Sequence, residues 1–143
     1  SQVLTKLVVP EMKKIKFGRI INIISTSVKA PIQNLGVSNT IRGAVANWSK
    51  TLSNELGEYS ITVNNILPGY TNTKRLESLI QKKSELSGKS TNVVKQQMIN
   101  SVPVKRFGEP EEVAHLVSFL ISSKASYING TNIVIDGGRT ASL

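Results

Sequence analysis

The sequence contains no cysteine and only one histidine. Without cysteine, neither a disulfide framework nor a thiolate metal site can form among the 143 residues, so the redox compartment stays open. The single histidine, His115, falls in an expected helix away from any nucleophile, where a surface or half-buried position is expected. No group of histidines and carboxylates has the spacing of metal ligands, which predicts a protein without a metal site.

Long hydrophobic runs are also missing. The longest, such as residues 20–24, are far shorter than the roughly 20 apolar residues that a membrane-spanning helix needs. The first residues do not resemble a signal peptide. We therefore expect a soluble, cytoplasmic protein without a membrane partner.

Acidic residues are scarce, with 9 Asp and Glu against 18 Lys and Arg, and the net charge is +9. Such an excess can indicate an anionic partner, for example a nucleic acid, a membrane surface or a phosphorylated ligand. The basic residues are scattered, however, without interleaved aromatic residues or a nucleic-acid motif. We expect no nucleic-acid partner; alternatively, another part of a longer protein balances the charge.

What the chain does contain is an alternation of helix and strand patterns. The strands are short and almost continuously apolar, which is typical of parallel strands buried on both faces. The expected elements are a helix to residue 16 with a kink or a new start at Pro10, a strand over 19–24, a helix over 38–56, a strand over 61–67, a helix beginning at 109–112, and a strand over 132–135. The polar stretch 70–101, with weakly amphipathic pieces at 76–80 and 93–99, is expected to be a mobile lid.

This alternation predicts an α/β fold with a doubly wound parallel sheet and right-handed crossovers. No linker composition divides residues 1–143, so a single domain is expected. The core face of the helix over 38–56 is expected to comprise Ile41, Val45, Trp48, Leu52 and Leu56, which recur at steps of three and four.

Two polar residues of the same helix, Ser38 and Arg42, are four residues apart and therefore lie on one face. They follow a strand end that carries Ser25 and Ser27. Ser38 either lines a site on that face or serves as the helix N-cap, a role that Asn39 can fill equally well.

Three segments resemble the carboxyl-terminal half of a short-chain dehydrogenase/reductase. Residues 18–25 (GRIINIIS) resemble the fifth strand of that family and its catalytic serine. Residues 61–73 (ITVNNILPGYTNT) resemble the sixth strand and the Pro-Gly loop that touches the nicotinamide, and residues 102–138 resemble the closing segment. The resemblance implies about three strands of a Rossmann-like sheet with flanking helices. It also implies hydride transfer between NAD or NADP and a small carbonyl or alcohol substrate, in a homodimer or homotetramer.

The glycine-rich TGxxxGxG loop of this family, which binds the dinucleotide, has no counterpart in the sequence. Gly137 and Gly138 follow the last strand and open no helix, so a tight turn is expected there. We therefore expect the chain to be the carboxyl-terminal part of a longer Rossmann-type domain. The residue that chooses between NAD and NADP lies in the missing part, so the choice stays open.

The family has a tyrosine about thirteen residues after its serine and a lysine four residues later. Counted from Ser25, these positions hold Ser38 and Arg42, and the resemblance implies that the three residues form the catalytic group. An aliphatic hydroxyl is a far poorer general base than a phenol, so Ser38 cannot simply replace the tyrosine. Arg42 keeps a positive charge and can hold a ribose hydroxyl or stabilise an oxyanion. An alignment with a two-residue deletion selects Ser27 in place of Ser25.

The resemblance also implies a set of cofactor contacts. Thr71 through its backbone amide and Thr73 through its hydroxyl occupy positions that resemble the nicotinamide-carboxamide contacts. Tyr70 can supply the missing phenol, although a tyrosine in such a loop more often packs. The implied cofactor-binding residues are Arg42, Pro68, Gly69, Thr71 and Thr73.

Two other functions stay open. Because the family's tyrosine and lysine are absent, a catalytically impaired relative that binds a ligand or serves as a subunit is one alternative. A basic binding module with salt-dependent affinity for nucleic acid is the other.

Overall fold

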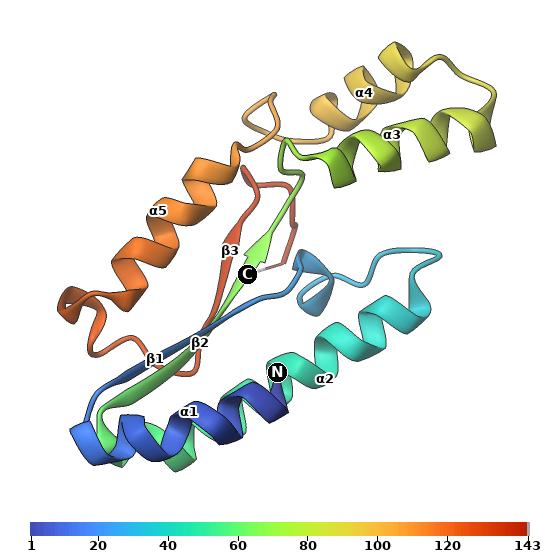
Figure 1. The fold of residues 1–143 in the computed structure, drawn as a ribbon. Helices are drawn as coiled ribbons and strands as arrows, with labels where there is room; N and C mark the ends of the chain where they lie inside the picture. Colours follow the sequence, from blue (N-terminus) through green and yellow to red (C-terminus); the bar gives the residue numbers. More distant parts are fainter. Residues whose placement is uncertain (143) are drawn as a thin grey trace.

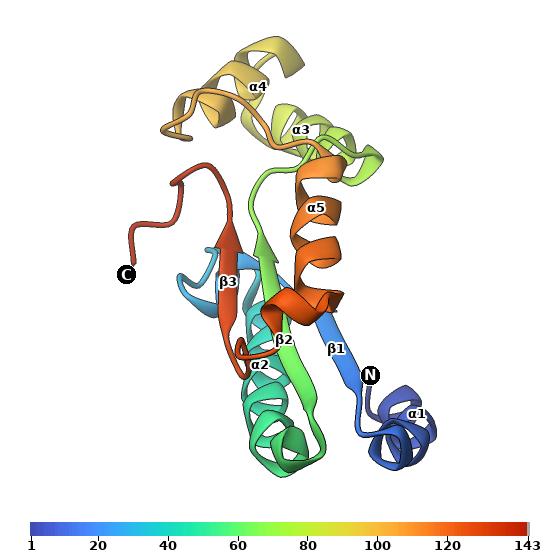
Figure 2. The same ribbon diagram turned by 90° about the vertical axis from the view of Figure 1, so that its left-hand side faces the viewer.

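A computed structural model describes residues 1–142 of the chain. Its three strands, β1 (Gly18–Ile23), β2 (Ile61–Pro68) and β3 (Asn132–Ile135), form one parallel sheet in the order β1-β2-β3 (Figures 1 and 2). The expected parallel α/β architecture is confirmed, and each strand lies within one residue of its expected position.

Helices cover both faces of this sheet, as Figures 1 and 2 show. On one face, α1 (Gln2–Ile15) and α2 (Gly36–Leu56) pack together, and α5 (Pro110–Ile121) covers the other. Two further helices, α3 (Lys74–Ser87) and α4 (Thr91–Asn100), form a lobe beyond the carboxyl ends of the strands (Figure 1). None of the helices within residues 1–142 is long and apolar enough to cross a membrane.

The central strand β2 is the only one of the three whose side chains are almost all buried. Its residues alternate between the faces, as the pleat requires. Val63 packs against the α1 and α2 side, whereas Ile66 packs against Leu120 of α5. β1 was expected to be buried on both faces, but it is half-buried and Ile23 is 50% exposed. β1 pairs only with β2 within residues 1–142, so its other edge is open to solvent.

A row of asparagine amides connects the three strands on the α2 side. Asn22, Asn65 and Asn132 are paired in register across the sheet. The Nδ2 of Asn22 donates to Oδ1 of Asn65 at 3.2 Å, and Nδ2 of Asn65 donates to Oδ1 of Asn132 at 2.8 Å. Asn22 also donates to the hydroxyl of Ser49 on α2 at 3.0 Å, so the row fixes the helix against the sheet.

Of the two alternatives expected at Pro10, a kink or a new start, the new start does not occur, because Pro10 lies inside the single helix α1. Pro10 is exposed, so the carbonyl that loses its helical partner there can bond to water.

The expected core face of α2 is confirmed in part. Leu56 is buried, and Val45 and Leu52 pack against buried clusters, whereas Ile41 is 57% exposed. The other buried residues of the helix are Ala46, Ser49 and Ser53. Small side chains face the strands because they allow the helix axis to approach the sheet closely.

The expected lid contains two complete helices in place of two short pieces. α3 and α4 pack against each other around a cluster of apolar side chains: Leu76, Ile80, Val94, Met98 and Phe107. The turn between them begins at Gly88, whose φ of 68° lies in the left-handed region that favours glycine.

Candidate functional site

One cavity of about 520 Å³ lies where the ends of β1 and β2 meet the starts of α2 and α3. Carboxyl ends of parallel strands meet at one edge of a sheet, which is the usual place for a ligand in this architecture. All the residues that the sequence predicts for the site line this single cavity: Ser25, Ser38, Arg42, Pro68, Gly69, Thr71 and Thr73.

Ser25 follows β1 and begins a short 3₁₀ turn over Thr26–Val28. Its Oγ accepts a hydrogen bond from the backbone N–H of Ser27 at 3.1 Å. Within residues 1–142 the Ser25 hydroxyl donates to no acceptor, so its proton can point to a ligand. Ser27, the alternative serine, is only 5% exposed and does not line the cavity. The placement therefore favours Ser25.

Ser38 is the third residue of α2, which begins at Gly36. The N-cap role expected for Ser38 or Asn39 is wrong, because the helix starts two residues earlier than expected. Asn39 instead donates from Nδ2 to the carbonyl of Ile32 at 2.8 Å and ties the preceding loop to the helix. The Ser38 hydroxyl makes no hydrogen bond within the described part of the chain, whereas Ser49 on the same helix donates to the carbonyl of Val45.

Arg42 lies one helical turn after Ser38 and is exposed at the cavity. No carboxylate among residues 1–142 forms an ion pair with it. Its guanidinium is therefore free to donate to an oxyanion or to a hydroxyl.

The Pro-Gly loop after β2 brings backbone groups to the cavity. A Cβ at Gly69 would lie 2.5 Å from Cβ of Asp136, so glycine is required here by the neighbouring strand end. On either side of Thr71, Tyr70 accepts from the N–H of Gly108 at 2.9 Å and Asn72 donates to the carbonyl of Gly108 at 2.8 Å. The N–H of Thr71 has no acceptor among the described residues. This donor is therefore available to a ligand in the cavity.

Thr73 has a structural role that the sequence did not indicate. Its Oγ1 accepts from the N–H of Leu76 at 3.4 Å and caps α3, and it donates to the carbonyl of Thr71 at 3.3 Å. The hydroxyl that was assigned to the carboxamide is thus already engaged, although Thr73 lines the cavity.

Tyr70 packs, as expected for a tyrosine in this loop. Its ring meets Phe107 edge-on at a centroid distance of 6.0 Å, and the guanidinium carbon of Arg139 lies 4.2 Å from the ring centroid. Tyr70 also lines the cavity.

Two carboxylates beside the loop have lowered pKa values. Hydrogen bonds from the Arg106 guanidinium, at 2.6 and 2.7 Å, and from the N–H of Glu109 lower the pKa of Glu112 to about 2. Burial opposes the charged form of Asp136, but hydrogen bonds from Thr140 and Gly138 outweigh it and lower the pKa of this carboxyl. Both groups are therefore charged at neutral pH and fix the chain around the Pro-Gly loop.

Sequence reasoning missed Arg75, the second residue of α3, which also lines the cavity. Its position two residues after Thr73 was the available signal, since the first turn of the lid follows the Pro-Gly loop directly. Arg42 and Arg75 are the only Lys, Arg, Asp or Glu side chains in the lining.

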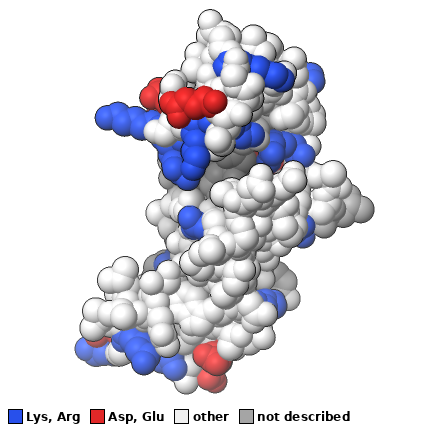
Figure 3. Space-filling view, turned by 90° about the vertical axis from the view of Figure 1, so that its right-hand side faces the viewer, with Lys and Arg blue, Asp and Glu red and all other residues white. Residues whose placement is uncertain are grey.

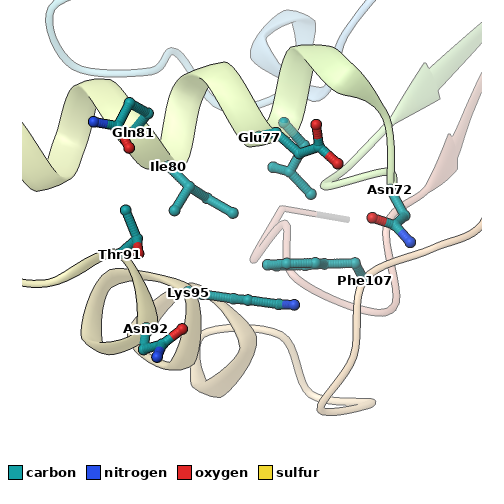
Figure 4. A pocket seen from close by; sticks show the side chains of 9 residues that line it. Asn72, Glu77, Ile80, Gln81, Thr91, Asn92, Lys95 and Phe107 are labelled. Carbon is teal, nitrogen blue, oxygen red and sulfur yellow. The ribbon is translucent and has the colours of Figure 1, made fainter.

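A second cavity, of about 270 Å³, lies inside the lobe between α3 and α4 (Figure 4). Figure 4 shows Ile80 pointing from α3 into this space and Lys95 extending from α4 below the ring of Phe107. None of the predicted site residues lines it.

The parallel sheet and the cavity at its carboxyl edge define the chain as a Rossmann-like α/β protein. Residues 2–140 match the sequence profile of a family described as enoyl-(acyl carrier protein) reductase. The chain belongs to this family of short-chain dehydrogenases/reductases.

Individual relatives agree with this assignment. The chain is 37% identical to NADPH-dependent reductase BacG of Bacillus subtilis, over 92% of this chain and 51% of that protein. It is 35% identical to 3-oxoacyl-[acyl-carrier-protein] reductase FabG of Staphylococcus epidermidis, over 92% of this chain and 49% of that protein. The chain thus spans about half the length of the curated relatives it matches.

Solved structures show the same fold. The crystal structure of YwfH, an NADPH-dependent reductase involved in bacilysin biosynthesis, superposes with a TM-score of 0.91 at 35% identity, over 97% of this chain and 53% of that one. L-sorbose reductase from Gluconobacter frateurii, in complex with NADPH and L-sorbose, gives a TM-score of 0.89 at 30% identity, over 98% of this chain and 54% of that one.

Proposed function

We propose that the chain is the carboxyl-terminal part of an NAD(P)-dependent short-chain dehydrogenase/reductase that interconverts a carbonyl and an alcohol. The observation that carries this proposal is the meeting of Ser25, Ser38 and Arg42 with the Pro-Gly loop at one cavity. A preceding half would supply the glycine-rich loop for the cofactor, in agreement with relatives of about twice this length.

Each group of the cavity has a role that its contacts permit. Ser25 donates a hydrogen bond from its free hydroxyl to the substrate oxygen, and its orientation is fixed by the bond from Ser27. Arg42 stabilises negative charge on that oxygen or holds a ribose hydroxyl, since a guanidinium stays protonated throughout. Ser38 holds a water molecule that exchanges the proton, because its own hydroxyl is too weak an acid and base for the task.

The cofactor supplies or accepts the hydride when it is bound. Among the residues present, the free N–H of Thr71 and the guanidinium of Arg42 would hold its nicotinamide riboside. Relatives named as NADPH-dependent reductases support a nicotinamide cofactor.

A second candidate function follows from Ser38 and Arg42 themselves. If these residues do not support proton transfer, the protein is an impaired relative that binds a ligand or serves as a subunit. The two candidates differ in turnover and not in cofactor binding.

The test is oxidation of NADH and NADPH by the full-length protein over a panel of ketones and aldehydes. Turnover supports the enzyme, and we expect Arg42→Gln to lower kcat/KM by about 100-fold, since electrostatic stabilisation of a reacting oxygen is lost. Lys50→Gln removes an exposed cation from the same helix outside the cavity and is expected to leave the rate unchanged. Cofactor binding without turnover of any substrate would reject the enzyme and support the second candidate.

A further inference from the structure

We propose that the substrate of this cavity carries an oxyanion group, a carboxylate or a phosphate, and that Arg75 binds it. The inference rests on the proposed function, because it names the class of carbonyl compound that the site would take. Its source is the distribution of charge around the cavity.

The lining holds two arginines and no carboxylate. Arg42 comes from α2 and Arg75 from α3, on either side of the strand ends. Two like charges that share a cavity repel each other, and a bound anion relieves this repulsion. The planar guanidinium fork also matches a carboxylate or phosphate group with two parallel hydrogen bonds.

Arg42 and Arg75 differ from the other three arginines of the chain, whose guanidinium groups are already engaged. Arg106 pairs with Glu112, Arg19 donates to the carbonyls of Gly18 and Ser60, and Arg139 stacks on Tyr70. Within residues 1–142, Arg42 and Arg75 have neither an ion pair nor a hydrogen bond to another side chain or to the backbone. Their donors are therefore available to a ligand.

The position of Arg75 separates its role from that of Arg42. Arg75 lies in the first turn of the 14-residue helix α3, whose N-cap Thr73 also lines the cavity. The helix dipole adds partial positive charge at this end. Arg42 is assigned to the reacting oxygen or the ribose, so Arg75 is the cation left for a second group of the substrate.

Apart from the two arginines and the serine and threonine residues described above, the wall of the cavity is mainly apolar and includes Leu76, Leu79, Ile24 and Val113. An apolar body with one charged end is the shape of a small oxo acid or of a carbonyl phosphate. In Figure 3, lysine and arginine side chains lie along the lower side of the upper lobe, beside the narrowing of the molecule. This distribution favours the approach of an anion.

Paired substrates test the inference in the full-length protein. The panel contains 2-oxo and 3-oxo acids with their methyl esters, and dihydroxyacetone phosphate with dihydroxyacetone. We expect kcat/KM to be about 10- to 100-fold higher for the charged member of a pair, in line with a charge-assisted hydrogen bond. The acid and phosphate arms identify which oxyanion is preferred.

Variants of Arg75 and Lys74 test which residue is responsible for the preference for charged substrates. Arg75→Gln is expected to remove the preference for the charged member and to leave the neutral member unaffected, whereas Arg75→Lys retains part of it. Lys74→Gln removes the adjacent cation, which lies outside the cavity lining, and is expected to change neither. If Arg75→Gln lowers kcat/KM equally for charged and neutral substrates, the assignment of Arg75 is wrong.

A binding measurement separates this inference from the proposed function. Titration calorimetry compares 2-oxobutyrate with butanone on the wild type and on Arg75→Gln. Arg75-dependent binding of 2-oxobutyrate without any turnover would keep the inference and reject the proposed activity. Turnover of esters and acids at equal rates would support the proposed activity and reject the inference. If no charged compound binds or reacts better than its neutral partner, the inference is wrong.

Discussion

Counted from Ser25, the family resemblance implies that Ser38 and Arg42 occupy the tyrosine and lysine positions, and we propose that the two exchanges have different chemical consequences. The alkoxide of a serine is more basic than the phenolate of a tyrosine by several pKa units. The proton therefore has to pass through another group. Arginine preserves the cation of the lysine and adds a planar fork of donors. The exchange therefore weakens proton transfer at the site while it preserves electrostatic stabilisation and favours anions.

The lowered pKa of Glu112, beside the Pro-Gly loop, predicts how the stability of the fold depends on pH. The pKa of Glu112 is about 2 in the folded chain, below the usual 4.5, because Arg106 and the N–H of Glu109 donate to its carboxylate. A lowered folded pKa contributes stability that is present above about pH 4.5 and is lost as the pH falls toward 2. We expect Glu112→Gln to be less stable than the wild type at neutral pH and to lose less stability between about pH 5 and pH 2.

Urea unfolding at a series of pH values measures this difference. Glu111→Gln is the matched control, since Glu111 is the exposed neighbour on the same helix turn and forms no ion pair within residues 1–142. It should keep the pH dependence of the wild type. A Glu112→Gln protein with the wild-type slope would show that the ion pair does not persist in solution.

Among the structural elements, the three strands depend on the asparagine row for more than backbone pairing. Asn65 is only 3% exposed and bonds to Asn22 on one side and Asn132 on the other. Asn65→Ala removes both bonds and leaves the side-chain oxygen of the half-buried Asn132 without its donor. We expect a loss of about 2 to 3 kcal/mol in the free energy of unfolding, measured with urea.

Asn54→Ala is the control for this substitution, because Asn54 is an exposed residue of α2 whose side chain makes no hydrogen bond within the described residues. Its effect should stay within about 0.5 kcal/mol. Equal stability of Asn65→Ala and Asn54→Ala would mean that water replaces the amide row at no cost.

Two elements were predictable from local sequence signals alone. The run from Ile61 to Leu67 is apolar enough for a buried strand. Glu109 and Glu112 form a capping box at the start of α5, and Pro110 is the first residue of that helix. The lid helices gave a weaker signal, since each buries only a narrow stripe against the other. Their polar composition therefore hid two complete helices.

The orientation of α2 and part of the site required the tertiary structure. Periodicity shows which residues share a face but not which face meets the sheet, so Ile41 was assigned to the core although it is 57% exposed. Family spacing found Ser25 and Arg42. Arg75 belongs to no motif, and only the packing of α3 beside the strand ends brings it to the cavity.

At the scale of the whole molecule, the exposed apolar residues form a pattern that the described chain does not explain. On α1, Val3, Leu4 and Leu7 are 73%, 68% and 72% exposed, and on α2, Val37 is 78% exposed. Val3, Leu4 and Leu7 share one face of α1, and exposed apolar groups gathered in this way mark contact surfaces. The family resemblance implies that the first helix and α2 pack against their mates in a homodimer or homotetramer.

We predict that the full-length protein self-associates through this surface and that Leu4→Glu with Leu7→Glu weakens the association. In a twofold interface each substitution occurs on both subunits, so four charges enter one apolar contact and the dissociation constant should rise by at least about 100-fold. Sedimentation velocity over a range of concentrations measures this shift. Lys6→Glu adds a negative charge to an exposed position of the same helix and should leave the oligomer intact. A different result, in which the double variant unfolds while its folded fraction keeps the wild-type oligomer, would mean that the rest of the same polypeptide covers α1. The apolar face would then stabilise the fold of one subunit, and the contact between subunits would have to lie elsewhere.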